Sequence, residues 1–225
     1  MPSHHAPLCC TTQTEAAEAA TEDAVAEEPA APAYPTVNGW TADEKAFCWG
    51  LPGAISPMGD FDPLGLAKDL DLTEMKRYRE AEVTHGRVAM TAVLGFLVAE
   101  SFHPLFGGEI GGPAIYHLTE VRKVAPIFFE LLAGTIATAE LYRSLVGWVS
   151  PQDVKKYFGG ELKDSYYPGD IGFDPLGLKP SSPAEFVDMQ NKELNNGRLA
   201  MLAAMGFIVQ ERINETPILE NLSSM

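Results

Sequence analysis

The chain has 225 residues and a formal net charge of −15 at pH 7, with 31 acidic and 16 basic side chains. This charge argues against a nucleic-acid-binding function, because it would be repelled by the phosphate backbone. The three cysteines, Cys9, Cys10 and Cys48, are odd in number and lack zinc-ligand spacing, so they predict neither a metal site nor a disulfide framework.

Residues 1–38 form an acidic segment rich in Ala and Pro that contains no Lys or Arg. We expect this segment to be disordered, because its composition cannot bury a core. It is also too acidic for a transit peptide and lacks the apolar stretch of a signal peptide. The remaining residues, 39–225, are predicted to form one helical domain.

Three long helices are predicted along this domain. The first runs from an N-cap at Thr73 to about Phe102, and the third from Ser182-Pro183 to about Ile213. The second is expected from about Thr119 to Val149, with Pro126 near its start. A helix of roughly 30 residues is about 45 Å long, which exceeds the ~30 Å hydrocarbon thickness of a bilayer. The pattern therefore predicts an all-α membrane protein with three transmembrane helices.

The distribution of basic residues supports this topology independently. With three crossings, eleven Lys and Arg lie on the N-terminal side, in residues 1–82 and 143–192. The other side has three, namely Arg122, Lys123 and Arg212. Such a bias is typical of the positive-inside rule.

The first and third helices are copies of one another. The stretch Glu82–Glu100 repeats as Glu193–Glu211 at an offset of 111 residues, and a loop before each helix, Phe61–Leu66 and Phe173–Leu178, reads Phe-Asp-Pro-Leu-Gly-Leu both times. The offset aligns His85 with Asn196, Gly86 with Gly197 and Arg87 with Arg198. The duplication predicts two crossing helices related by pseudo-two-fold symmetry.

Charged residues inside these helices are expected to pair between the copies. Arg87 lies five residues after Glu82, about 140° around the helix axis, and cannot easily reach it. We therefore expect Arg87 to pair with Glu193 and Arg198 with Glu82, which neutralises four charges that are costly in a membrane. Small residues at the crossing would let the two backbones approach closely: Gly86, Gly197, Ala89 and Ala200.

The same helices carry isolated polar side chains, each of which could serve as the axial ligand of a metal ion. A carboxylate held by arginine keeps a lone pair, and a magnesium ion already bound in a porphyrin-type ring needs one further ligand. Gln210 follows Asn196 by fourteen residues, or about 21 Å along the axis, which favours two separate rings over one shared metal. A single Glu or His inside a helix is more often solvated or hydrogen-bonded, and Met or Phe at helical spacing is usually core. The paired occurrence of Glu, Arg and Gly in both copies favours the binding function.

The two Glu-x-x-(His/Asn)-Gly-Arg helices resemble the first and third helices of the light-harvesting chlorophyll-binding protein superfamily. The approach to the third helix, Tyr167–Leu178, resembles it as well, and the similarity covers about Ser56 to Ile213. The sequence around the third helix is most similar to the fucoxanthin chlorophyll a/c proteins of red-lineage algae, including a branch associated with photosystem I.

This resemblance implies a set of pigment ligands. The axial ligands of chlorophyll magnesium would be Glu82, His85, Glu193, Asn196, Gln210 and, in the middle helix, Glu140. Arg87 and Arg198 would lock the crossing, and Arg143 would compensate the charge of Glu140. Green-plant members carry a Gln eight residues before the middle-helix Glu. Here that position is Leu132, and Glu130 is the candidate substitute.

The resemblance also implies the remaining cofactors and the function. Asp62 and Asp174, in the two repeated loops, would hold the end groups of carotenoids such as fucoxanthin. The cofactors would be chlorophyll a and chlorophyll c rather than b. The expected protein is an antenna and not an enzyme. It would lie in the plastid thylakoid membrane with a stromal N-terminus, beside a photosystem core (I rather than II), neighbouring antenna proteins and lipids.

Two alternatives remain open from the sequence. One is a photoprotective member of the same superfamily, in which an acid-sensing lumenal carboxylate switches the pigment array to dissipation. The other is a soluble helical interaction module whose Glu–Arg pairs are surface ion pairs.

Overall fold

The computed structural model describes residues 34–223, apart from 57, 103 and 155–159. Most of the expected disordered segment, residues 1–33, lies outside the described residues. The helices, in chain order, are η1 (Phe47–Gly50), α1 (Leu72–Ser101), η2 (Leu105–Gly108), α2 (Ala114–Val124), α3 (Phe128–Gly147), α4 (Pro183–Asn214) and α5 (Ile218–Ser223). Extended pairing in the described part of the chain is limited to two isolated bridges, so the all-α prediction is confirmed.

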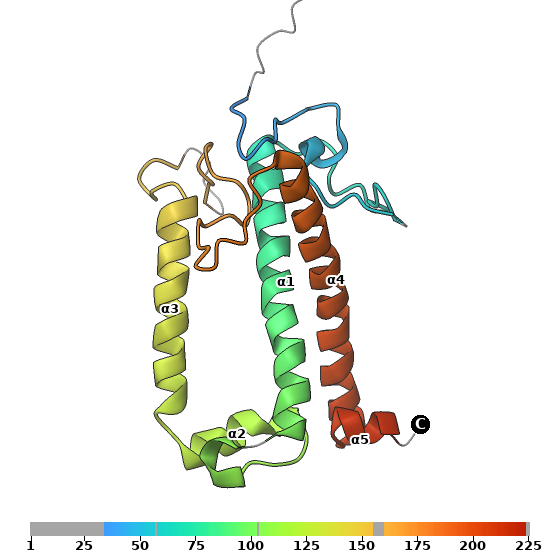
Figure 1. Cartoon of the computed structure of the whole chain (residues 1–225), viewed down its shortest axis with the longest axis vertical. Coiled ribbons are helices and arrows are strands. Elements are labelled where there is room, and N and C mark those ends of the chain that lie inside the picture. Colours follow the sequence, from blue (N-terminus) through green and yellow to red (C-terminus); the bar gives the residue numbers. More distant parts are fainter. Residues whose placement is uncertain (1–33, 57, 103, 155–159, 224–225) are drawn as a thin grey trace, which may run out of the picture. The chain divides into compact units, whose positions relative to one another are not determined.

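Helices α1 and α4 pack against each other along their length (Figure 1) and make the most extensive contact between any two elements described. Their buried apolar residues are related by the sequence offset of 111 residues. Met75 corresponds to Phe186, Val83 to Leu194, Gly86 to Gly197 and Ala89 to Ala200. Further along, the rings of Phe96 and Phe207 meet edge to face, with centroids 6.3 Å apart. The duplicated sequence thus produces a duplicated contact face.

The backbones come closest at the two glycines. A Cβ atom built on Gly86 would lie 3.1 Å from the Cα of Gly197, and one on Gly197 would lie 3.0 Å from the Cα of Gly86. A side chain on either residue would therefore push the helices apart at the crossing.

The ends of α1 and α4 differ little from the sequence prediction. Asp71, rather than Thr73, is the N-cap of α1, and α1 ends at Ser101. Ser182 is the N-cap of α4 and Pro183 lies in its first turn, as predicted. Proline is tolerated there because a first-turn N–H has no partner inside the helix.

The predicted middle helix, 119–149, is wrong as a single element. The chain forms α2 and α3 instead, which meet at a bend of 111° around Pro126. Proline removes a backbone donor and clashes with the preceding turn, so the helix ends before it and restarts after it. In Figure 1, α2 runs across the lower end of α1, while α3 runs beside α1 at some distance.

Length and apolar composition together single out the bent pair of helices. Among the described residues, no single helix combines the length and low charge of a membrane span, whereas α2 and α3 taken together do. The charged residues of the duplicated motif lower the average hydropathy of α1 and α4.

A small aromatic core covers the N-terminal ends of α1 and α4. It consists of Trp40, Leu51, Met75, Tyr167 and Phe186. Trp40 meets the Tyr167 ring edge to face, with centroids 5.9 Å apart. Asn38 ties the segment before α1 to the loop before α4 by donating to Asp170 at 2.7 Å. These contacts hold the segments that precede the two Phe-Asp-Pro-Leu-Gly-Leu loops at the N-terminal ends of the paired helices.

Beyond this core, large apolar side chains lie exposed along all three long helices. Examples are Val88 and Leu94 on α1, Leu131 and Leu145 on α3, and Leu202 on α4. Exposed apolar surface of this extent is unfavourable in water and marks a surface that contacts a protein partner, a membrane or an apolar ligand.

We expect Gly86→Leu to lower the free energy of unfolding by about 3 kcal/mol or more, because the larger side chain overpacks the helix crossing. The midpoint of thermal unfolding, followed by helical circular dichroism in mild detergent, measures this. Gly95→Leu is the matched control, since a Cβ on Gly95 in the same helix meets nothing within 4 Å. Equal midpoints for the two variants would contradict the close crossing.

Candidate ligand-binding site

Two ion pairs join α1 to α4 beside the glycine crossing. Arg87 Nε lies 2.6 Å from Glu193 Oε1, and Arg198 Nε lies 2.7 Å from Glu82 Oε1. The structure thus brings together the residues that the duplication pairs. All four side chains are partly exposed, so each pair stands at the edge of the helix contact and faces the surrounding medium.

The two ion pairs are not equivalent. Glu82 has a second partner in Arg79, whose NH1 lies 2.9 Å from Glu82 Oε2. The residue 111 positions after Arg79 is Gln190, which accepts a hydrogen bond from the Tyr167 hydroxyl instead. Glu82 therefore faces two guanidinium groups, whereas the equivalent position beside Glu193 carries a neutral amide.

His85 and Asn196, which the duplication aligns, make the same local bond. Asn196 Nδ2 donates to the Lys192 carbonyl at 2.8 Å, and His85 Nδ1 lies 2.7 Å from the Ala81 carbonyl. In both cases the acceptor stands four residues earlier in the helix. A carbonyl oxygen can only accept, so Nδ1 of His85 carries a proton, and in the neutral ring Nε2 is then the acceptor. The Oδ1 atom of Asn196 is an acceptor in the same way, and both side chains are exposed.

The other candidate ligands lie apart from this pair. Arg143 holds Glu140, on α3, through Nε at 2.9 Å and NH2 at 2.7 Å. Both bonds meet Oε2, so Oε1 of Glu140 lies outside the ion pair. Glu130 is exposed in the first turn of α3, and Gln210 is partly exposed near the end of α4. Coordinating side chains that lie this far apart suit separate bound molecules. The described residues contain no group of three His, Cys, Asp or Glu that could share a bare metal ion.

The two repeated loops fold alike, and their aspartates hold the turn. Asp62 accepts from the amides of Leu66 and Ala67 at 2.9 and 2.7 Å. Asp174 accepts from the amides of Leu178 and Lys179 at 2.9 and 2.8 Å. The Ala67 amide above all lowers the pKa of Asp62, and the Lys179 amide does the same for Asp174, so both carboxylates stay charged. Each turn is completed by a glycine with positive φ, Gly65 at 66° and Gly177 at 64°.

The loops also present apolar side chains outward, although Asp62 is partly exposed and Asp174 is exposed. The exposed residues are Phe61, Leu64 and Leu66 in the first loop and Phe173, Leu176 and Leu178 in the second. A ligand that approaches either loop therefore meets an apolar surface whose shape an internal carboxylate maintains.

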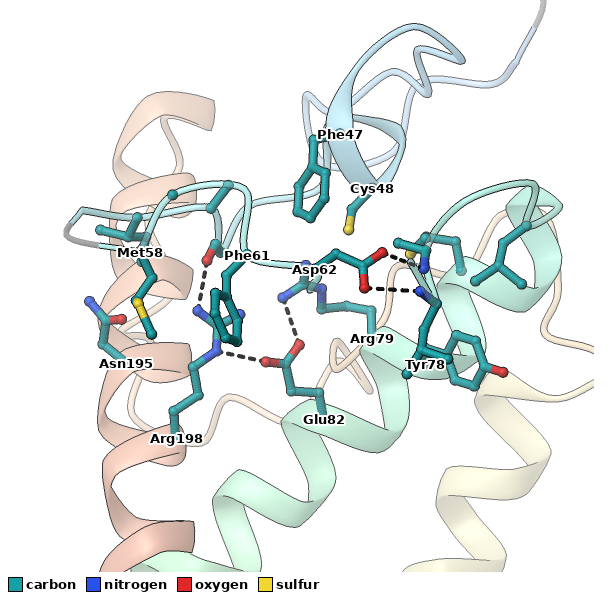
Figure 2. A pocket seen from close by; sticks show the side chains of 18 of the residues that line it. Phe47, Cys48, Met58, Phe61, Asp62, Tyr78, Arg79, Glu82, Asn195 and Arg198 are labelled. Atoms are coloured by element: carbon teal, nitrogen blue, oxygen red, sulfur yellow. Dashed lines mark hydrogen bonds and ion pairs between the residues drawn. The ribbon is translucent and has the colours of Figure 1, made fainter. Parts of the chain in front are cut away.

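A cavity of about 770 Å³ lies between the first loop and the start of the paired helices. Figure 2 shows Arg198 between Glu82 and a backbone carbonyl, and Asp62 turned toward its own loop. That carbonyl belongs to Gly53, which accepts from Arg198 NH1 at 2.7 Å. The walls are mainly apolar, with Phe61 from the loop and Leu202 from α4 among them. The cavity therefore suits an apolar ligand whose polar end reaches the ion-paired residues.

Cys48 lines the same cavity from η1. Burial raises the pKa of its thiol, so the side chain is neutral and behaves as a small apolar residue. This agrees with the absence of a zinc-type cysteine pattern in the sequence.

A second duplicated pair, at the far end of α1 and α4, was missed in the sequence analysis. Glu211 accepts from the amides of Ala114 and Ile115, both at 3.0 Å, and so caps the start of α2. Glu100 accepts from the Ile218 amide at 2.9 Å and from the Leu219 amide at 3.3 Å, and so caps α5. The two carboxylates are also close enough to influence each other electrostatically. Their separation of 111 residues, at the end of each repeat, was the signal in the sequence.

Comparison with known proteins gives a consistent result. The family model described as "Chlorophyll A-B binding protein" matches residues 47–212. A fucoxanthin-chlorophyll a-c binding protein of Isochrysis galbana is 48% identical over 186 residues, which cover 82% of this chain and 86% of that protein. Light-harvesting complex stress-related protein 3.2 of Chlamydomonas reinhardtii is 47% identical over 187 residues, covering 80% and 70%. Chlorophyll a-b binding protein 4 of Arabidopsis thaliana is 33% identical over 178 residues, covering 76% and 67%.

The unequal ion pairs predict unequal mutational effects. We expect Arg87→Leu to lower the free energy of unfolding by about 2 kcal/mol more than Arg198→Leu, because Glu82 keeps Arg79 whereas Glu193 loses its guanidinium. Thermal unfolding in detergent gives the comparison.

Gln190→Arg supplies the matched rescue. It sets a guanidinium three residues before Glu193, as Arg79 stands three residues before Glu82. Added to Arg87→Leu, it should recover part of the lost stability. Equal losses for the two single variants, or no recovery, would show that the second arginine does not matter.

Proposed function

This chain belongs to the chlorophyll A-B binding protein family, and from that premise we propose that it is an antenna that passes excitation energy to a photosystem. It is a light-harvesting, chlorophyll-binding protein. The observation that carries the assignment of residues is the two-fold related set of acceptor atoms on α1 and α4, beside charge-compensated carboxylates. Membership of this family favours pigment binding over the alternative of a soluble interaction module.

We assign the axial ligands of chlorophyll magnesium to side chains on the long helices. The ligands would be Glu82, His85, Glu140, Glu193, Asn196 and Gln210, with Glu130 as a further candidate. An arginine of opposite charge is paired with each of Glu82, Glu140 and Glu193, which lowers the cost of placing these carboxylates in an apolar surround. When bound, the pigments supply light absorption and excited states, whereas these residues fix position, orientation and local polarity.

Carotenoids would lie along the grooves on both sides of the α1–α4 pair. The cavity beside the first loop, with its mainly apolar walls and the Arg198–Glu82 pair, supports a carotenoid end group at this position. Asp62 and Asp174 would act by holding the loops in shape, and the exposed Phe and Leu residues of the loops would contact the pigments. This assigns the aspartates a supporting role at the predicted carotenoid sites.

Three membrane spans, formed by α1, α3 and α4, remain our proposal for the topology. α3 has 20 residues, or about 30 Å, which matches the hydrocarbon thickness. α1 and α4 are longer, and their intrahelical charges are paired across the crossing, so the apparent cost of burying them in lipid is largely offset. α2 would then lie along the membrane surface, with the N-terminus on the stromal side as the positive-inside bias suggests.

The pigments and partners are proposed at a finer level from the resemblance. The relative from Isochrysis galbana, which binds chlorophylls a and c by its name, favours chlorophylls a and c with fucoxanthin-like carotenoids over chlorophyll b. The chain would work in the thylakoid membrane as a scaffold rather than an enzyme, next to neighbouring antenna proteins and a photosystem core. We retain photosystem I as the proposed partner.

Absorption and fluorescence excitation spectra of the protein purified in mild detergent test this function. We expect chlorophyll a bands, a chlorophyll c Soret shoulder and a broad blue-green carotenoid band, all exciting chlorophyll a emission. Chlorophyll b bands would keep the antenna and overturn the pigment assignment. A colourless protein would overturn the function. His85→Leu should remove one chlorophyll per chain, while Asn196→His, which keeps an outward acceptor, should retain the full number.

A second candidate function is dissipation of excess excitation. The stress-related relatives of Chlamydomonas reinhardtii, at 47% and 46% identity, favour it, as does the pair Glu100 and Glu211. When two neighbouring carboxylates influence each other, one of them takes up a proton as the surrounding pH falls. Because each also accepts from backbone amides at the start of a helix, protonation would weaken the caps of α2 and α5.

Chlorophyll fluorescence lifetimes at neutral and acidic pH distinguish the two functions. A dissipative protein should show a shorter lifetime on acidification, and Glu211→Gln should lose most of that change. Glu185→Gln, at an exposed position on α4, is the control and should keep it. A wild-type lifetime that does not change with pH would leave the antenna function alone.

A further inference from the structure

Glu80 is a buried carboxylate on α1 that the duplicated motif does not explain. Its side chain is 3% exposed and accepts three hydrogen bonds. The donors are the Gly169 amide at 2.6 Å, the Tyr166 hydroxyl at 3.1 Å and Arg143 NH1 at 3.2 Å. The residue 111 positions later is Asn191, so Glu80 has no charged counterpart in the second repeat. Its role therefore lies outside the symmetric crossing.

Arg143 connects Glu80 to the middle helix. Its NH1 group meets Glu80 Oε1, while its Nε and NH2 groups meet Glu140 Oε2. One guanidinium thus serves two carboxylates, and the three side chains carry a net charge of −1 together. Glu80 is buried and has three donors, whereas the side chain of Glu140 is 56% exposed. The charge that Arg143 leaves uncompensated therefore falls mainly on Glu140.

Few other contacts hold this part of α3. Gly147, its last residue, packs on the Tyr166 ring, and Lys163 donates to the carbonyls of Leu145 and Val146 at 2.7 and 3.0 Å. These contacts fix the end of the helix to the loop before α4. Among the described residues, the Glu80–Arg143 bond is the only ion pair between α1 and α3. It is placed one helical turn from Glu140, so it sets the direction in which Arg143 and Glu140 face.

We propose that Glu80 is a positioning residue for the chlorophyll ligand Glu140. By holding NH1 of Arg143, Glu80 confines the guanidinium to one oxygen of Glu140 and leaves Oε1 with the electron density to coordinate magnesium. Without the charge on Glu80, Arg143 can turn fully onto Glu140 and pair with both of its oxygens. This inference rests on the proposed pigment-binding function, since it concerns the same ligand.

Reconstitution of the full chain with chlorophylls and carotenoids, followed by pigment analysis and absorption spectra, tests the proposal. We expect Glu80→Gln to lose about one chlorophyll per chain. Its difference spectrum against the wild type should match that of Glu140→Gln. The double variant should lose no more than either single variant, because both changes affect one site. Glu185→Gln, exposed on α4, is the control and should keep the full complement.

A second comparison separates positioning from loop docking. Tyr166→Phe removes one hydrogen bond to Glu80 but leaves Arg143 in place, so it should retain the chlorophyll. The proposal is overturned if Glu80→Gln keeps every chlorophyll with an unshifted spectrum. It is also overturned if that variant loses pigments across all bands along with thermal stability, which is the result of a purely structural role. A wild-type chain that binds no pigment would instead overturn the proposed function.

Discussion

The close approach of α1 and α4 at Gly86 and Gly197 is the constraint on which the rest of the site depends. The ion pairs Arg87–Glu193 and Arg198–Glu82 connect the helices only because no side chain separates the backbones there. The pairs in turn leave charge-compensated carboxylates on the outer edges of the contact, next to His85 and Asn196. Helix packing and the placement of the candidate coordinating side chains thus both result from the same small residues.

The two sequence repeats differ in the residues around the helix crossing, so the two sides of the crossing differ in charge and hydrogen bonding. Arg79 reinforces Glu82 on one side, while Gln190 takes the equivalent place on the other and binds Tyr167. Glu80 and Asn191 differ in the same way, since only Glu80 carries a charge. Through Arg143 that charge couples the middle helix to one half of the duplicated pair. An array of ligands held by such a scaffold is symmetric in outline, but each site differs in its electrostatic surround.

The sequence predicts those parts of the structure that the duplication determines. An offset of 111 residues was sufficient to pair Arg87 with Glu193, because symmetry supplies the long-range contact that local periodicity lacks. Pro126 was visible in the sequence, yet a mild kink and a bend of 111° look alike there, since the angle depends on what α2 packs against. The contacts of Glu80 involve Arg143, Tyr166 and Gly169, which share no repeat with it, so no pattern could reveal them.

The two repeated loops are built around their aspartates. The resemblance to the family implies that Asp62 and Asp174 hold carotenoid end groups. In the fold each carboxylate accepts hydrogen bonds from amides of its own loop, and the recurring Phe and Leu side chains are exposed. The repeat therefore preserves a shape, and the shape presents an apolar surface. The long helices show a related pattern, since Arg87 and Arg198 pair with carboxylates across the crossing while many large apolar side chains, such as Leu94 and Leu202, are exposed. A protein built in this way needs apolar material around it to be stable, and bound pigments and lipid would provide it.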